Sequence, residues 1–262
     1  MTSAFPLCFA VLSSGVFGQV LMNIAIVSSG DTANVTFRGA RVAGPPVINA
    51  PYAGELVSEH VRTVAGGAQL AQTNEIQRVF RDSQGRTRTE RPVMMASPVP
   101  QPGPVLIEVT DPVAGFAWIA DDQSRTVHRV PIQPKPAAPD PGPPPKVPLV
   151  PLRDSSLQDV KSEKLGTQNI DGFLAEGTRT TMTWRAGSQG NDRPFSDTRE
   201  TWFATELKTM VLSKYVSMRG GESTTRLTNI SRAEPDPALF QPPQEYVIVD
   251  EEGSFSMTLK RP

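Results

Sequence analysis

The chain has few of the residues that build covalent or metal-based sites. Its single cysteine is Cys8, and its two histidines, His60 and His128, are far apart with no carboxylate or cysteine at ligand spacing. A zinc site needs three or four such ligands, so we predict no metal site and interpret each histidine as a partly exposed strand residue. One cysteine also excludes an intramolecular disulfide framework, leaving packing and hydrogen bonds to stabilise the fold.

The chain also has no excess of charge of either sign. Its formal net charge is −1 over 262 residues, and the basic residues are spread along the sequence. Nucleic-acid binding requires a basic surface that displaces counterions from phosphates. We therefore expect no nucleic-acid partner.

Patterns typical of catalytic sites are missing as well. The nearest match to a nucleophile elbow places Ser188 between glycines at 187 and 190, but the elbow needs a helix after the serine and a histidine downstream. Here 191–194 reads Asn-Asp-Arg-Pro, which breaks a helix, and both histidines lie upstream. The acidic pair 121–122 occupies a predicted turn. We expect no catalytic residue, no cofactor and no enzyme activity.

The N-terminal segment has no charged residue before Asp31. Residues 4–17 are mostly apolar and end in small residues up to Gly18, as in a secretory signal. The sequence therefore predicts a signal peptide over 1–18 and a periplasmic or secreted protein. An uncleaved anchor over 5–27 remains the alternative, although polar residues and a proline interrupt that span.

Strand signals recur along the rest of the chain, whereas no 12-residue stretch has helical periodicity with caps. The candidate strands are rich in β-branched and alternating apolar residues and are separated by Gly- and Asp-containing turns. About twelve are predicted: 55–64, 69–81, 86–95, 105–110, 116–120, 126–132, 160–170, 173–184, 198–204, 209–219, 223–231 and 246–249.

These strands predict a mainly β fold, a large curved antiparallel meander resembling a half barrel, because long twisted sheets curl. Ten of the 21 positions in 131–151 are proline, which cannot donate to a sheet ladder, so this range is predicted to be a linker or exposed loop. It would separate an N-terminal β half, 31–130, from a C-terminal half of the same sheet, 152–249. The polar tail, 250–262, is expected to be frayed.

The C-terminal half carries a candidate ligand-binding face. The strand 209–219 alternates, which is typical of a sheet with one covered and one wet face. The candidate residues are large and apolar: Trp184, Trp202, Phe203, Met210, Leu212, Val216 and Met218. The last four are predicted to share one face, and the alternative is that any of the seven belongs simply to the core.

Several segments of this half resemble the LolA-like superfamily, which includes periplasmic lipoprotein carriers and RseB-type regulators of envelope stress. The resemblance rests on 166–172, 201–203, 210–212, 228–230 and the closing 236–240 (Asp-Pro-Ala-Leu-Phe) with prolines at 242 and 243. It implies a half-open β barrel. Family members close their apolar concavity with N-terminal amphipathic helices, which this sequence does not predict.

The chain as a whole resembles a set of uncharacterised secreted proteins of soil bacteria. The shared segments are a turn at 80–88 (Phe-Arg-Asp-Ser-Gln-Gly-Arg-Thr-Arg) and 111–115 (Asp-Pro-Val-Ala-Gly). This second resemblance implies export but no particular activity.

Three functional hypotheses follow. The first is an envelope protein that binds a lipid, a lipoprotein acyl chain or another apolar ligand on the concave face of its sheet. The second is a protein-interaction or sensor module that binds an envelope protein through the sheet and the proline-rich loop. The third, a secreted hydrolase, lacks the necessary residues.

Overall fold

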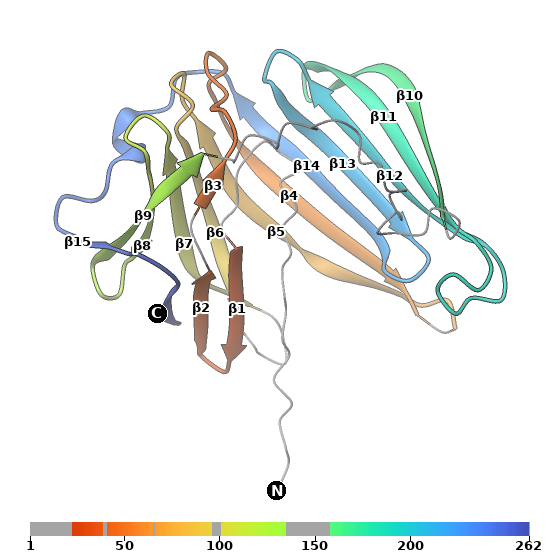
Figure 1. The fold of residues 1–262 in the computed structure, drawn as a ribbon, viewed down its shortest axis with the longest axis horizontal. Coiled ribbons are helices and arrows are strands. Elements are labelled where there is room, and N and C mark those ends of the chain that lie inside the picture. Colours follow the sequence, from red (N-terminus) through yellow and green to blue (C-terminus); the bar gives the residue numbers. More distant parts are fainter. Residues whose placement is uncertain (1–22, 39–40, 65, 96–100, 135–157, 262) are drawn as a thin grey trace, which may run out of the picture. The chain divides into compact units, whose positions relative to one another are not determined.

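A computed structural model describes residues 23–38, 41–64, 66–95, 101–134 and 158–261. The described chain consists of strands and one short 3-10 helix, without an α-helix (Figure 1). One sheet has 13 strands and is largely antiparallel, and a second has three strands. The predicted mainly β fold is confirmed. No helix among these residues is long and apolar enough to span a membrane, and the predicted signal peptide lies outside them.

The chain divides into two compact units that are interleaved in sequence. The first unit comprises residues 1–57, 75–134 and 228–262, and the second comprises 58–74 and 135–227. Three strands contribute residues to both units: β4 (Tyr52–Thr63), β5 (Gln69–Arg81) and β14 (Gly221–Ser231). The predicted linker 131–151 begins with the end of a strand, β9, and its residues 135–151 lie outside the described ranges.

The other elements fall wholly within one unit. The first unit contains β1 (Asn23–Ser29), β2 (Thr32–Arg38), β3 (Arg41–Ala43), β6 (Thr87–Met95), β7 (Gln101–Asp111), β8 (Phe116–Asp121), β9 (Thr126–Pro134), the 3-10 helix η1 (Pro237–Phe240), β15 (Val247–Asp250) and β16 (Phe255–Lys260). The second unit contains β10 (Gln158–Ile170), β11 (Phe173–Trp184), β12 (Phe195–Ala204) and β13 (Thr209–Ser217).

The order of strands in the large sheet is not that of one continuous meander. The order is β10-β11-β12-β13-β14-β4-β5-β6-β7-β8-β9-β15, with β3 also paired to β9. The last strand of the C-terminal meander, β14, therefore lies next to the first long strand, β4. The final member, β15, pairs with β9 in parallel rather than antiparallel orientation.

The first unit has a core on each face of its part of the large sheet. On one face, residues of the three-stranded sheet β1-β2-β16 pack against β6 to β9, burying Val35, Phe37 and Met257 completely or nearly so. On the other face, Phe240 of η1 is buried against Val109, Trp118, Ala120 and Val127. Successive side chains of β8 point alternately to the two faces of the sheet. Because an apolar layer covers each face, β8 is buried along almost its whole length.

The prediction that 250–262 is a frayed tail is wrong. Residues 255–260 form β16, which pairs with β2, and Met257 and Leu259 are buried in the core. Asp250 ends β15 and makes an ion pair with Arg129. The segment alternates Phe-Ser-Met-Thr-Leu-Lys, a period of two that matches a half-buried strand.

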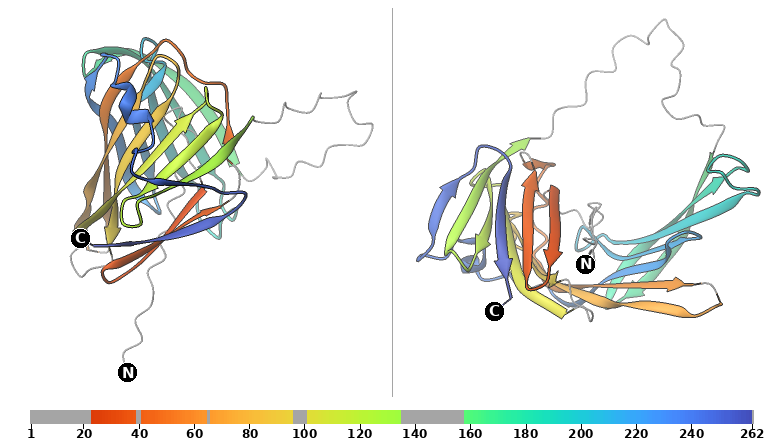
Figure 2. Two further views of the ribbon diagram at one scale, coloured as in Figure 1. Left: turned by 90° about the vertical axis from the view of Figure 1, so that its left-hand side faces the viewer. Right: turned by 90° about the horizontal axis from the view of Figure 1, so that it is seen from below.

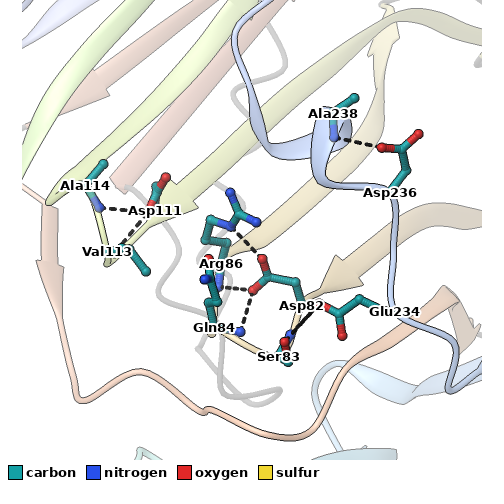
Figure 3. Close-up of polar contacts among 10 residues, drawn as sticks. All are labelled: Asp82, Ser83, Gln84, Arg86, Asp111, Val113, Ala114, Glu234, Asp236 and Ala238. Atoms are coloured by element: carbon teal, nitrogen blue, oxygen red, sulfur yellow. Dashed lines mark hydrogen bonds and ion pairs between the residues drawn. The ribbon is translucent and has the colours of Figure 1, made fainter.

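Three segments singled out in the sequence, 80–88, 111–115 and 236–240, each contain an aspartate that accepts hydrogen bonds from nearby backbone N–H groups (Figure 3). Asp82 accepts hydrogen bonds from the backbone N–H groups of Gln84 and Arg86, and Gly85 takes the positive φ of 84° that the turn requires. Asp111 accepts in the same way from residues 113 and 114, and Asp236 from residue 238. These motifs therefore have a structural role in the turns.

Candidate functional site

The second unit contains all seven predicted ligand-binding residues, on strands β11 to β13 and the turn after β13. Figure 2 shows the ribbon of these strands, coloured from green-teal to light blue, from two further directions. Its strands pair in antiparallel register, so residues directly opposite one another point to the same face. A bulge in β13 interrupts the alternation: Trp202 pairs with Leu212, but the next residue, Phe203, pairs with Met210. Val211 is the extra residue of the bulge.

The bulge makes the prediction of one common face wrong. Leu212 shares a face with Trp202, and Val216 lies on that same face opposite Thr198. Met210 lies on the other face with Phe203. Met218 follows the end of β13 in a turn and is 71% exposed. Sequence alternation alone could not show this, since one inserted residue exchanges the faces of everything beyond it.

One face of these strands is polar over most of its length. Arg179 lies between Glu163 and Glu200 on the neighbouring strands, with nitrogen–oxygen distances of 3.1 and 2.6 Å. These hydrogen bonds raise the pKa of Arg179, the bond to Glu200 contributing most. Lys214 and Glu222 form a further pair at 2.8 Å. We call this surface the charged face.

At one end the charged face gives way to a small core. Trp202 is 8% exposed, and its ring covers Gly177, the residue directly opposite on β11. A Cβ atom on Gly177 would lie 2.7 Å from that ring, so only glycine fits under the indole. Trp202 is therefore a packing residue of the second unit.

The opposite face, which we call the aromatic face, carries the larger apolar side chains. Trp184 and Phe195 are cross-strand partners with ring centroids 6.4 Å apart, and Met182 lies opposite Asp197. Tyr215 is on the same face two strands from Thr180. These four large side chains are half-buried. Toward the other end, Phe203 is 44% exposed beside Glu176.

A carboxylate lies among the rings of the aromatic face. Asp197 Oδ2 accepts hydrogen bonds from Trp184 Nε1 at 3.3 Å and from the Tyr215 hydroxyl at 3.4 Å. Asp197 Oδ1 is buried and accepts no hydrogen bond from the described residues. Two guanidinium groups stack on the neighbouring rings, Arg199 on Tyr215 and Arg219 on Phe195.

The structure thus divides the predicted residues between two faces. Trp184, Phe203 and Met210 belong to the aromatic face, whereas Trp202, Leu212 and Val216 belong to the other. The sequence reading missed Phe195, Asp197 and Tyr215. The spacing of two between Phe195 and Asp197 places them on one face of a strand and could have indicated the first two.

The residues that the sequence analysis weighed for catalysis or metal binding contact other residues of the fold in ordinary structural roles. Ser188 lies in the turn between β11 and β12, and its hydroxyl donates to the Arg185 carbonyl at 2.7 Å. His60 and His128 are half-buried strand residues, as predicted. His128 Nδ1 lies 2.7 Å from Glu251 and its ring stacks on Phe255. Within the described ranges, no group of three or more His, Cys, Asp or Glu residues could hold a metal ion.

No protein-family model matches the chain, and no curated protein does. Among solved structures, it is similar to an uncharacterised conserved protein from Thermus thermophilus (10% identity, 77% of this chain and 91% of that one, TM-score 0.38). It is similar to a chain of the Pseudomonas aeruginosa MucA/MucB complex (14% identity, 76% of this chain and 58% of that one, TM-score 0.38). A third similarity is to a LolA superfamily protein from Nitrosomonas europaea (7% identity, 75% of this chain and 92% of that one, TM-score 0.30).

The Nitrosomonas europaea protein belongs to the superfamily that segments of this sequence resemble. The identities and TM-scores are low, so we draw no conclusion from these similarities about the ligand, partner or activity of this chain.

Proposed function

We propose that this protein is a non-enzymatic, exported protein of the cell envelope that binds an apolar ligand, such as an acyl chain, on the aromatic face of its second unit. The observation that supports the proposal is the contrast between the two faces of β10 to β13. One face carries the Glu163–Arg179–Glu200 ladder, whereas the other exposes large apolar side chains, among them Val160 at 58% and Phe203 at 44%.

The physical argument is that apolar side chains gathered on one sheet face favour contact with an apolar surface. Burying such area contributes roughly 25 cal/mol per Å². Single exposed apolar residues are common, but a row of them over adjacent strands is typical of an interaction site. Val160 on β10 pairs with Met182 on β11, and Trp184 on β11 pairs with Phe195 on β12. These four side chains form what we call the apolar row, which crosses three strands. Export is supported by the apolar N-terminal sequence.

A matched pair of variants tests the face. Val160→Ser changes the aromatic face within the apolar row, and Val216→Ser makes the same substitution on the charged face, at exposures of 58% and 38%. Binding of the uncharged dye N-phenyl-1-naphthylamine is expected to weaken by about fivefold to tenfold in the first variant, since an apolar contact of this size is worth roughly 1–1.4 kcal/mol. The second should bind as the wild type does. Equal effects of the two variants would contradict the assignment of the face.

A direct test uses the protein purified from its own envelope. Lipid extraction followed by mass spectrometry is expected to recover an acyl-chain compound in stoichiometric amount. Recovery of no such compound, together with no dye binding, would count decisively against the proposed function.

A second candidate function, binding of a protein partner, is favoured by β10. This 13-residue strand lies at the end of the sheet order and pairs with β11 within the described chain. Strands at sheet edges can accept an additional strand from another chain. If the proline-rich segment takes part, a pull-down from envelope extract should lose its partner when residues 134–148 are deleted, and an unchanged pull-down would exclude that role.

A further inference from the structure

We propose that the aromatic face selects ligands with a positively charged, N–H-donating head group, and that Asp197 is the residue that recognises it. This inference rests on the proposed function, because it specifies which amphiphiles the face takes. The ligand class is an aliphatic primary ammonium compound, whose chain lies on the apolar row and whose head lies among Trp184, Phe195 and Tyr215.

The first argument is the hydrogen bonding of the carboxylate. Asp197 Oδ2 has two donors from the rings, Trp184 Nε1 and the Tyr215 hydroxyl. Oδ1 is buried without a donor among the described residues. Buried acceptors in folded proteins are nearly always hydrogen-bonded, and one that is not invites a partner from outside the chain. An ammonium group supplies both the missing donor and the opposite charge.

The second argument is the aromatic surroundings. Ring faces attract cations through their quadrupole, and aromatic residues around a site are a common means of binding ammonium groups. The face already shows this preference, because Arg199 lies 5.3 Å from the centroid of Tyr215 and Arg219 lies 5.0 Å from that of Phe195. Both arginines are exposed, so another cation can compete with them for these rings, although displacing Arg219 also breaks its hydrogen bond to the Gln189 carbonyl oxygen at 3.3 Å.

The third argument is the position of the carboxylate in the apolar row. Asp197 lies directly opposite Met182, and Met182 lies directly opposite Val160 at the outer strand. The carboxylate is therefore next to the side chains proposed to hold an acyl chain. A ligand with an apolar chain and an adjacent cationic head fits both features together.

The test uses calorimetric titration of the full chain with three probes below their micelle concentrations. Decylammonium has the chain and the N–H head, decyl sulfate has the same chain with an anionic head, and butylammonium has the head with a short chain. We expect decylammonium to bind the wild type about tenfold more tightly than decyl sulfate, the ratio given by one charged hydrogen bond.

Two variants separate the head group from the fold. Asp197→Asn removes the charge with little change in shape and should abolish the preference between the two decyl probes. Asp159→Asn is the matched control, because Asp159 is an exposed carboxylate on the charged face of the same sheet. It should leave the preference unchanged. Far-UV circular dichroism verifies that both variants fold. The preference of the wild type for decylammonium over decyl sulfate is measured on the unmodified protein, so this part of the test does not depend on the folding of a variant.

Each outcome bears on a different part of the proposal. Equal binding of both decyl probes, unaffected by Asp197→Asn, overturns the head-group inference and leaves the proposed function standing. Binding of butylammonium as tight as that of decylammonium, lost in Asp197→Asn, supports the cation site and contradicts the apolar-ligand function. Failure of all three probes to bind overturns both.

Discussion

At the scale of single residues, close backbone approach determines where the second unit tolerates a side chain. Gly221 begins β14 with a φ of +84°, and a Cβ atom there would lie 2.3 Å from the Val61 carbonyl oxygen. The adjacent Gly220 has its nearest such neighbour at 3.8 Å, the Ser217 side chain, and no positive φ. Both glycines appear equivalent in the sequence, but one of them is required for strand pairing.

We therefore expect Gly221→Ala to lower the free energy of unfolding by about 1–3 kcal/mol, because a carbonyl oxygen cannot move aside as a flexible side chain can. Gly220→Ala is the control and should change stability by less than about 0.5 kcal/mol. Urea unfolding followed by circular dichroism measures both. Equal destabilisation by the two substitutions would contradict the close approach at Gly221.

A buried ion pair gives a second prediction at this scale. Asp82 is 1% exposed and pairs with the Arg86 guanidinium, which also stacks on Phe240. Asp82→Ala should cost about 3–5 kcal/mol, since it leaves a largely buried cation and two turn amides without their acceptor. Asp236→Ala, which removes an exposed cap of η1, should cost only about 1 kcal/mol. A smaller loss at Asp82 than at Asp236, measured by thermal unfolding, would contradict this assignment.

At the scale of elements, strand β16 illustrates how a polar-looking terminus becomes part of the core. Its residues pair with β2 over the whole element, from Phe255 opposite Phe37 to Lys260 opposite Thr32. Phe37 and Phe255 stack with ring centroids 4.5 Å apart. The three-stranded sheet therefore needs residues 255–260 as its third strand.

Met257→Ala should lower the free energy of unfolding by about 2–5 kcal/mol, because Met257 is 4% exposed and its loss leaves a cavity. Thr258→Ala, on the exposed side of the same strand, is the control and should change it by less than about 0.5 kcal/mol. Chemical denaturation of both variants gives the comparison. A frayed terminus would instead show two equally neutral substitutions.

At the scale of the whole molecule, each unit carries a surface carboxylate whose pKa depends on one arginine. A hydrogen bond from Arg129 lowers the pKa of Asp250 in the first unit, and one from Arg185 lowers that of Asp159 in the second. The unfolded chain takes up protons at the ordinary aspartate value, about 3.9. The stabilisation is therefore present above that pH and is lost as the pH falls through the lower pKa values of the folded state.

We accordingly expect the stability of the wild type to decline below about pH 4 more steeply than that of the double variant Asp159→Asn/Asp250→Asn. Both carboxylates are exposed, so the difference should be small and should shrink at high salt. Urea midpoints at pH 7, 4 and 3 provide the measurement. Parallel pH profiles for the two proteins would show that neither ion pair contributes.

The sequence by itself determined the strands and many of the turns. The predicted range 69–81 agrees with β5 and 173–184 with β11, because alternating apolar residues and turn formers such as Gly85 act over a few residues. Only the tertiary structure decided which faces these strands present. Val211 is the extra residue of a bulge that puts Met210 and Leu212 on opposite faces. Strand β16 pairs with β2, although most of the sequence lies between them. Bulges and long-range pairings depend on complementary partners distant in sequence, which local periodicity does not encode.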